Sequence, residues 1–483
     1  MTLTITRANP LKFPNEILEQ IFQDDTGMLV TCMLLNKEWY MRMRTLCHTF
    51  RKIMVKVPGT SSSKEEPWKK GILHFISPTL VSVAVKAEQQ GIWSLLSFFE
   101  QHHEQGRIRT LDIITLPSDD LDSNRFDLSD LSVTFSTVCG NLTSLSIQTG
   151  ECPTIHGLLH LCPNLVILDC KLDDGTTNRD EDALQYHTSL RMLQISQQSR
   201  ITKQPDKYLP YLPQLQVLRI INDSTSYSDS TYHLNDVLAY AMTRTPNIKT
   251  FYVGKHRMKT RKLATLLHNN NGDRSGLQDI DLDKRVKFAE QHFVSFFRVA
   301  CQTLTRLRFE KPEYIRILGR EWEHPFIHLR ELRLECSNGS SSFYAVDIGR
   351  FLSYVPNIVK LWILNIRECM VTIIAPAIGR LHRLNELRID CRRCGSAPDI
   401  TSFGHLASIK SIEVANTKVT GFDPFLENLT RSGGHETLQF LKLEFKRTNH
   451  KPQETMETLV KTCARLKYAQ LKSSKYTAVH CLD

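Results

Sequence analysis

Apolar positions along this chain recur with one spacing. In Leu329-Arg330-Glu331-Leu332-Arg333-Leu334 three apolar residues, here called anchors, stand three and then two positions apart. The same frame returns along most of the chain, with first anchors 23 to 33 residues apart. The first anchors are Leu142, Leu165, Leu190, Leu215, Ile248, Leu277, Leu304, Leu329, Ile358, Leu384, Ile409, Leu438 and Leu466, and Leu80 and Ile108 fit upstream.

The spacing of the anchors predicts a short strand in each unit. The second and third anchors are two apart, so they point to the same face of a strand. One unit cannot bury that face, whereas stacked units form a parallel sheet that the returning helices cover. The period matches that of leucine-rich repeats. We therefore predict an α/β fold over residues 79–475: a leucine-rich-repeat horseshoe with a parallel concave sheet and helices on the convex side.

Residues 10–50 do not share the repeat. After two prolines, Ile17 and Ile21, like Leu18 and Phe22, stand four apart and predict one apolar stripe on a helix. Three short helices in about forty residues make a small core, and such a domain usually needs a partner. This favours a docking module.

The same residues carry a family resemblance. Phe13-Pro14-x-Glu16-Ile17-Leu18-x-x-Ile21-Phe22, followed by Leu35-Asn36-Lys37-x-Trp39, resembles an F-box. F-box proteins bind the Skp adaptor of Skp–cullin–F-box ubiquitin ligases, and an F-box followed by leucine-rich repeats is a known architecture. The resemblance implies a non-catalytic subunit of a cullin–RING ligase whose repeats hold an unknown protein for ubiquitination and proteasomal degradation. Carried over, the adaptor-binding positions are Pro14, Ile17, Leu18, Ile21, Phe22, Leu35 and Trp39.

Three alternatives stay open. The N-terminal helices could be a cap on the solenoid, since repeat arrays need polar-faced ends. The chain could be a leucine-rich-repeat interaction scaffold or GTPase regulator unrelated to ubiquitin. It could also be an enzyme on the same scaffold, which would need a pocket of convergent titratable groups.

Two short segments flank the predicted domains. Residues 51–78 are rich in Pro, Gly, Ser and Lys and are predicted to be a linker with a helical joint. Residues 476–483 are predicted to be a C-terminal tail.

Composition narrows the partners. The formal charge of +10 is spread without a dense basic block, so we expect no nucleic acid. No apolar run of eighteen residues and no signal-peptide core is present, so we expect no membrane and an intracellular location, cytoplasmic or nuclear. The cysteines should then be reduced. Cys139, Cys162, Cys301 and Cys463 each stand three before a first anchor, which predicts small buried side chains.

No motif for chemistry emerges. Phosphate-loop, zinc-protease and serine-hydrolase signatures are absent, and Cys391 and Cys394 form only half of a zinc spacing. We expect no catalytic residue, metal or cofactor.

Residues between the second and third anchors should face solvent on the concave sheet and contact the partner. They are Asp112, Ser146, Asp169, Gln194, Arg219, Tyr252, Asp281, Arg308, Arg333, Trp362, Arg388, Glu413, Lys442 and Gln470. Trp and Arg dominate interface energetics, so the predicted substrate-binding residues are Tyr252, Arg308, Arg333, Trp362 and Arg388, a surface suited to an acidic or phosphorylated segment.

Acidic residues on the same face suggest a second interpretation. They could simply form cross-strand ion pairs with the arginines, which contribute little when exposed. These acids are Glu310, Glu331, Glu335, Glu386 and Asp390. Such a ladder is the more ordinary outcome.

Overall fold

The computed structural model of the protein describes residues 52–56, 81–87, 89–101, 108–115, 136–152, 155–172, 186–196, 209–221, 232–233, 235–254, 276–283, 286–287, 289–336, 342–392, 395, 397–444, 452–472 and 477–482. The chain forms two compact units, the first running to Leu215 and the second taking most of the chain from Gln216 onward. The predicted F-box, with its seven adaptor-binding positions, lies outside the described residues.

The first unit is a parallel sheet whose strands pair in chain order from β1 to β6. Its strands are β1 Lys52–Lys56, β2 Ser82–Ala87, β3 Thr110–Thr115, β4 Ser144–Cys152, β5 Ile167–Leu172 and β6 Met192–Ser196. Its helices are α5 Gln89–Gln101, α7 Ser136–Asn141 and α8 Ile155–Leu161. The division between the units falls within β7 Val217–Ile221.

The second unit continues the same plan, with parallel pairing from β9 to β18. Its strands in this sheet are β9 Thr250–Gly254, β10 Asp279–Leu282, β12 Arg306–Phe309, β13 Glu331–Glu335, β14 Lys360–Arg367, β15 Glu386–Arg392, β16 Ser411–Ala415, β17 Phe440–Glu444, β18 Tyr468–Lys472 and β19 Thr477–Cys481. Two short strands, β8 Tyr232–His233 and β11 Val286–Lys287, pair separately.

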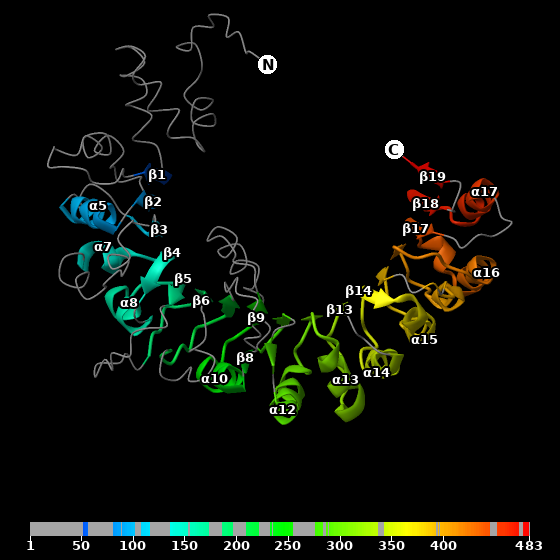
Figure 1. Ribbon diagram of the computed structural model, residues 1–483, viewed down its shortest axis with the longest axis horizontal. Helices are drawn as coiled ribbons and strands as arrows, with labels where there is room; N and C mark the ends of the chain where they lie inside the picture. Colours follow the sequence, from blue (N-terminus) through cyan, green and yellow to red (C-terminus); the bar gives the residue numbers. More distant parts are fainter. Residues whose placement is uncertain are drawn as a thin grey trace, which may run out of the picture. The chain divides into compact units, whose positions relative to one another are not determined.

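Helices form the other layer of the second unit. They are α10 Asn235–Arg244, α12 Glu290–Ala300, α13 Pro312–Glu321, α14 Ser342–Ser353, α15 Glu368–Ile378, η4 Thr401–His405, α16 Phe422–Ser432, η5 Gly434–Glu436 and α17 Pro452–Thr462. Within this unit the strands line the inner side of the curve and the helices the outer side (Figure 1).

The anchors explain the packing. Second anchors lie opposite one another in neighbouring strands, as Leu332 does with Leu361 and Leu361 with Leu387, and all three are buried. In most described repeats the carbonyl directly after the first anchor accepts two N–H groups from the next repeat, as Arg330 O does from Val359 N at 2.7 Å and Lys360 N at 2.9 Å. The predicted leucine-rich repeat is therefore confirmed as an α/β solenoid in the described residues.

The predicted buried cysteines are confirmed. Each lies where the chain enters a strand and has an exposed fraction of 7% or less. Burial raises the pKa of Cys301 and Cys463, which keeps their thiols protonated. Their role is therefore packing.

Both predicted ends of the solenoid need correction. Strand β1 lies in the predicted linker, where Ile53 and Val55 stand opposite Val83 and Val85 in parallel register. Strand β19 lies entirely in the predicted tail and pairs antiparallel with β18. The sheet is therefore longer than residues 79–475, because each end adds one strand that continues its hydrogen bonding.

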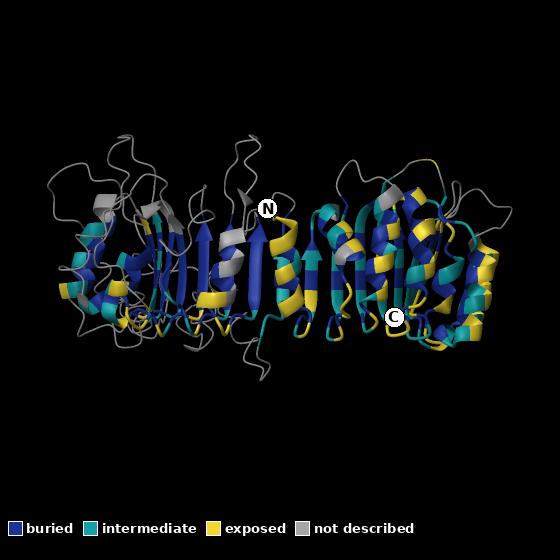
Figure 2. Cartoon of the chain, turned by 90° about the horizontal axis from the view of Figure 1, so that it is seen from below, coloured by how far each residue is buried: buried dark blue, intermediate teal, exposed yellow. Residues whose placement is uncertain are grey.

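Burial separates the strands into two kinds. Strands β6, β7 and β9 are buried at every position, whereas β10 and β12 to β17 alternate buried anchors with less buried residues (Figure 2). In the second unit, accessible side chains on the strand face therefore belong to β10 and the strands that follow it, and in the first unit β3 also has partly exposed positions such as Asp112. Among the described residues no helix is long and apolar enough to cross a membrane.

Candidate functional site

The candidate site is a row of side chains on the strand face of the second unit. Each comes from the position between the second and third anchors, and parallel register sets it opposite its neighbours. This central row consists of Asp281, Arg308, Arg333, Trp362, Arg388, Glu413 and Lys442. It brings together four of the five predicted substrate-binding residues.

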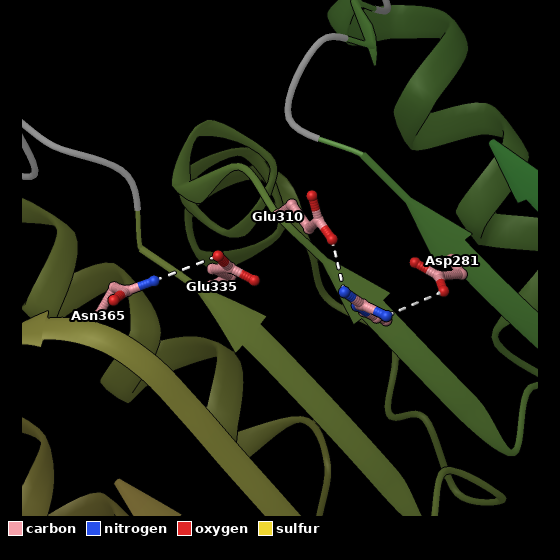
Figure 3. A network of polar contacts seen from close by, with 5 residues as sticks. Asp281, Glu310, Glu335 and Asn365 are labelled. Carbon is pink, nitrogen blue, oxygen red and sulfur yellow. Dashed lines mark hydrogen bonds and ion pairs between the residues drawn. The ribbon is translucent and has the colours of Figure 1, made fainter. Parts of the chain in front are cut away.

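Arg308 is held between two carboxylates (Figure 3). Its Nη1 lies 3.5 Å from Asp281 Oδ2 on the neighbouring strand, and its Nη2 donates to Glu310 Oε1 at 2.5 Å. Both pairs are less than a third exposed, so solvent screens them less than a surface pair. The positive charge of Arg308 is therefore balanced by carboxylates of the protein itself.

Burial dominates the two carboxylates beside Arg308. It raises the pKa of Asp281 from 3.8 to about 6, and the nearby charge of Arg308 only partly opposes this. Burial also raises the pKa of Glu310, with the negative charge of Asp283 adding to the effect. Adding another negative charge here would therefore be unfavourable.

Trp362 is fixed at the centre of the row. Its indole Nε1 donates to Glu386 Oε1 at 2.8 Å, across to the next strand. The Arg333 guanidinium carbon lies 5.7 Å from the centre of the indole ring, within cation–π range. A partly buried Trp held in this way presents a preorganised apolar surface beside a cation.

Arg333 differs from the other arginines of the row. No side-chain hydrogen bond or ion pair joins it to any residue in the described part of the chain, and its Nε, like that of Arg308, is buried without an acceptor. Burial lowers the pKa of Arg333, and the neighbouring charge of Arg308 lowers it further. Its charge is therefore incompletely compensated.

Beyond Trp362 the row becomes an ion-pair ladder. Arg388 Nε and Lys442 Nζ both contact Glu413, at 3.5 and 3.0 Å. In the row before the second anchors, Lys360 Nζ lies 3.2 Å from Glu331 Oε1. These residues stand opposite each other in the register. Of the five acids predicted to form such a ladder with arginines, these pairs contain only Glu331, and its partner is a lysine. Each exposed pair contributes roughly 0–1 kcal/mol.

Two asparagines hold carboxylates at the ends of strands. Asn365 and Asn416 have positive φ angles of 59° and 63°. Asn365 donates to Glu335 Oε1 at 3.2 Å (Figure 3), and Asn416 donates to Asp390 Oδ1 at 2.5 Å. The sequence interpretation missed them, although an Asn two positions after a third anchor is a usable signal because Asn tolerates this conformation.

Tyr252 does not fit the prediction of an exposed contact. Its exposed fraction is 8%, and the Arg219 guanidinium carbon lies 3.7 Å from the centre of its ring. In the first unit Ser146 donates to Asp169 at 3.2 Å, and both side chains are fully buried. These polar groups are satisfied within the protein, so within the second unit solvent exposure of the row begins at Asp281.

Within the described residues, neither metal-ligating side chains nor the cavity described here indicates a second functional site. The described residues contain no group of three or more metal-ligating side chains. Cys391 is buried in β15, as its strand position predicts. An open cavity of about 580 Å³ lies on the other side of the repeats, lined by residues that include Arg380, His382 and His405. None of the central row lines it.

Comparison with known proteins adds little to the fold assignment made from the strand register. No known family and no curated protein matches the sequence. A leucine-rich-repeat protein of Leptospira interrogans is 12% identical, covering 88% of this chain and 97% of that chain with a TM-score of 0.38. The Rad7 and Elc1 complex of yeast is 13% identical, covering 58% and 75% with a TM-score of 0.27. The fold assignment rests on the strand register alone.

Proposed function

We propose that the protein is a non-catalytic binding scaffold that captures a protein partner on the strand face of its second unit. The observation that carries this proposal is Trp362, fixed by Glu386 and set opposite Arg333 in the strand register. Trp and Arg on one rigid surface are the commonest energetic centres of interfaces. A continuous sheet supplies that rigidity without any loop having to order.

The second part of the proposal concerns the complex in which the scaffold acts. Residues 10–50 resemble an F-box, so the chain would be a substrate-recognition subunit of a Skp–cullin–F-box ubiquitin ligase. In that role the N-terminal module binds the Skp adaptor, and the repeats hold the protein to be ubiquitinated. The effect on rate would come from proximity, because tethering raises the effective concentration of substrate lysines near the ubiquitin carrier.

The adaptor role can be tested by co-expression with a Skp adaptor and pull-down. The test variant is Ile17→Asp/Leu18→Asp in the full chain, which adds two charges to the predicted apolar stripe. Wild type should capture the adaptor, and the variant should lose at least about 90% of it, since two buried charges would remove a contact of several kcal/mol.

The matched control is Asn15→Asp/Gln20→Asp, which adds the same two charges at polar positions of the same segment. It should retain the adaptor, and circular dichroism should show the repeats folded in every variant. Failure of wild type to bind would leave the chain as a leucine-rich-repeat scaffold unrelated to ubiquitin.

A further inference from the structure

One cation on the strand face of the second unit lacks a carboxylate partner among the described residues. The five acids predicted to lie on this face all have a donor: Glu310 and Arg308, Glu331 and Lys360, Glu335 and Asn365, Glu386 and Trp362, Asp390 and Asn416. Arg308 and Arg388 are also paired. Among the described residues of the central row, Arg333 alone is a cation with neither a side-chain hydrogen bond nor an ion pair to a carboxylate.

Leaving this arginine unpaired is unfavourable. The Nε of Arg333 is buried without an acceptor, so it has lost hydration without gaining a hydrogen bond. The indole ring of Trp362 compensates only in part, because its centre is 5.7 Å from the guanidinium carbon. A ligand carboxylate that reached the two Nη groups of Arg333 would supply the missing counter-ion in a bidentate pair.

The charges around Arg333 determine whether a carboxylate or a phosphate binds there more favourably. The groups acting electrostatically on Arg333 are the cation Arg308 and the three carboxylates Glu335, Asp281 and Glu310. Together with Arg333 they carry two positive and up to three negative charges, so the cluster has no surplus positive charge to balance a dianion. A carboxylate, with one negative charge, therefore suits Arg333 better than a phosphate group, with about −1.5 to −2 charges near neutral pH.

We propose that Arg333 and Trp362 form a docking site for one carboxylate side chain of a partner protein, within a segment whose neighbouring apolar residue covers the indole ring. This inference rests on the proposed function as a binding scaffold and names its partner chemistry. It is independent of the adaptor role. Arg308 and Arg388 then act as parts of the fold, since their charges are already used.

The test uses an array of nine-residue peptides with varied flanks, each made with Glu, Gln or phosphoserine at the centre. Purified full chain is applied as wild type, Arg333→Gln and Arg388→Gln. We expect a subset of peptides whose Glu version binds wild type at least about tenfold better than its Gln and phosphoserine versions, the size of one charge-assisted pair. Arg333→Gln should abolish the preference and Arg388→Gln should keep it.

Arg388→Gln is a matched control, because it removes the same charge from the same row two strands away. Arg333→Lys is a second variant, which keeps the charge but loses the bidentate fork and should weaken Glu binding. Equal binding of Glu and Gln versions, stronger binding of phosphoserine versions, or equal loss in both arginine variants would overturn the inference. Capture of the Skp adaptor without any preference for Glu peptides would refute the Arg333 site and leave the adaptor role intact.

Discussion

At the scale of single residues, the balance between burial and pairing decides how each polar group behaves. Asp281 has an arginine partner at 3.5 Å, yet burial raises its pKa to about 6. Between its ordinary value of 3.8 and about 6, the folded state therefore binds more protons than the unfolded state. The stability that Asp281 contributes is present below this window and is lost as pH rises through it.

Asp281→Asn tests this balance, because asparagine does not titrate. We expect the free energy of unfolding of wild type to fall relative to that of Asp281→Asn as pH rises from about 4 to about 7. Urea denaturation at a series of pH values measures the difference. Arg308→Gln removes the opposing charge, so in that background the fall should extend to higher pH. A flat or rising difference would show that burial does not dominate at Asp281.

The sequence predicts which side chains share the central row but not how they pair. The spacing of two between anchors places Arg308, Arg333 and Trp362 on one face, as the structure confirms. Trp362, however, donates a hydrogen bond to Glu386, which lies two positions out of its register, whereas Arg388 stands opposite Trp362. Such diagonal contacts depend on side-chain length and rotamer, which spacing does not encode.

At the scale of elements, neighbouring helices approach closely where glycine allows it. A Cβ on Gly319 in α13 would lie 2.5 Å from the backbone oxygen of Asp347 in α14. A Cβ on Gly349, also in α14, would meet only Ala377 Cβ at 3.8 Å. The two glycines therefore have different roles, although both stand inside helices.

Alanine substitutions at these glycines should have opposite effects. Gly319→Ala should lower the free energy of unfolding by about 1–3 kcal/mol, because the backbone of α14 must move. Gly349→Ala should raise it by up to about 1 kcal/mol, because alanine favours the helix and fits. Urea unfolding of both variants measures the changes. A stabilising Gly319→Ala would contradict the close packing of α13 on α14.

Sequence reasoning missed the end strands for different reasons. The stretch before β2 carries Phe50-x-x-Ile53-x-Val55, which has the anchor spacing with an aromatic first anchor, so β1 could have been found. Strand β19 runs antiparallel and has no anchors, because it closes the last edge and need not repeat. Edge elements of this kind leave no periodic signal.

At the scale of the whole molecule, the chain is proposed to have two separate binding sites, one in residues 10–50 and one on the strand face of the second unit. The solenoid follows from the repeat, since spacing alone predicts parallel strands backed by helices. The adaptor end rests on a motif in residues 10–50, outside the described residues. Its partner and the partner of the strand face should therefore be separable by mutation, because the two sites use different residues.

The most direct test is to purify tagged full chain from cells under proteasome inhibition as wild type, Ile17→Asp/Leu18→Asp and Trp362→Ala, and to quantify the bound proteins. The N-terminal variant should lose the Skp adaptor while keeping the proteins held by the repeats. Trp362→Ala should keep the adaptor and reduce those proteins about tenfold or more. Loss of the same proteins from both variants, or no loss from Trp362→Ala, would contradict the account.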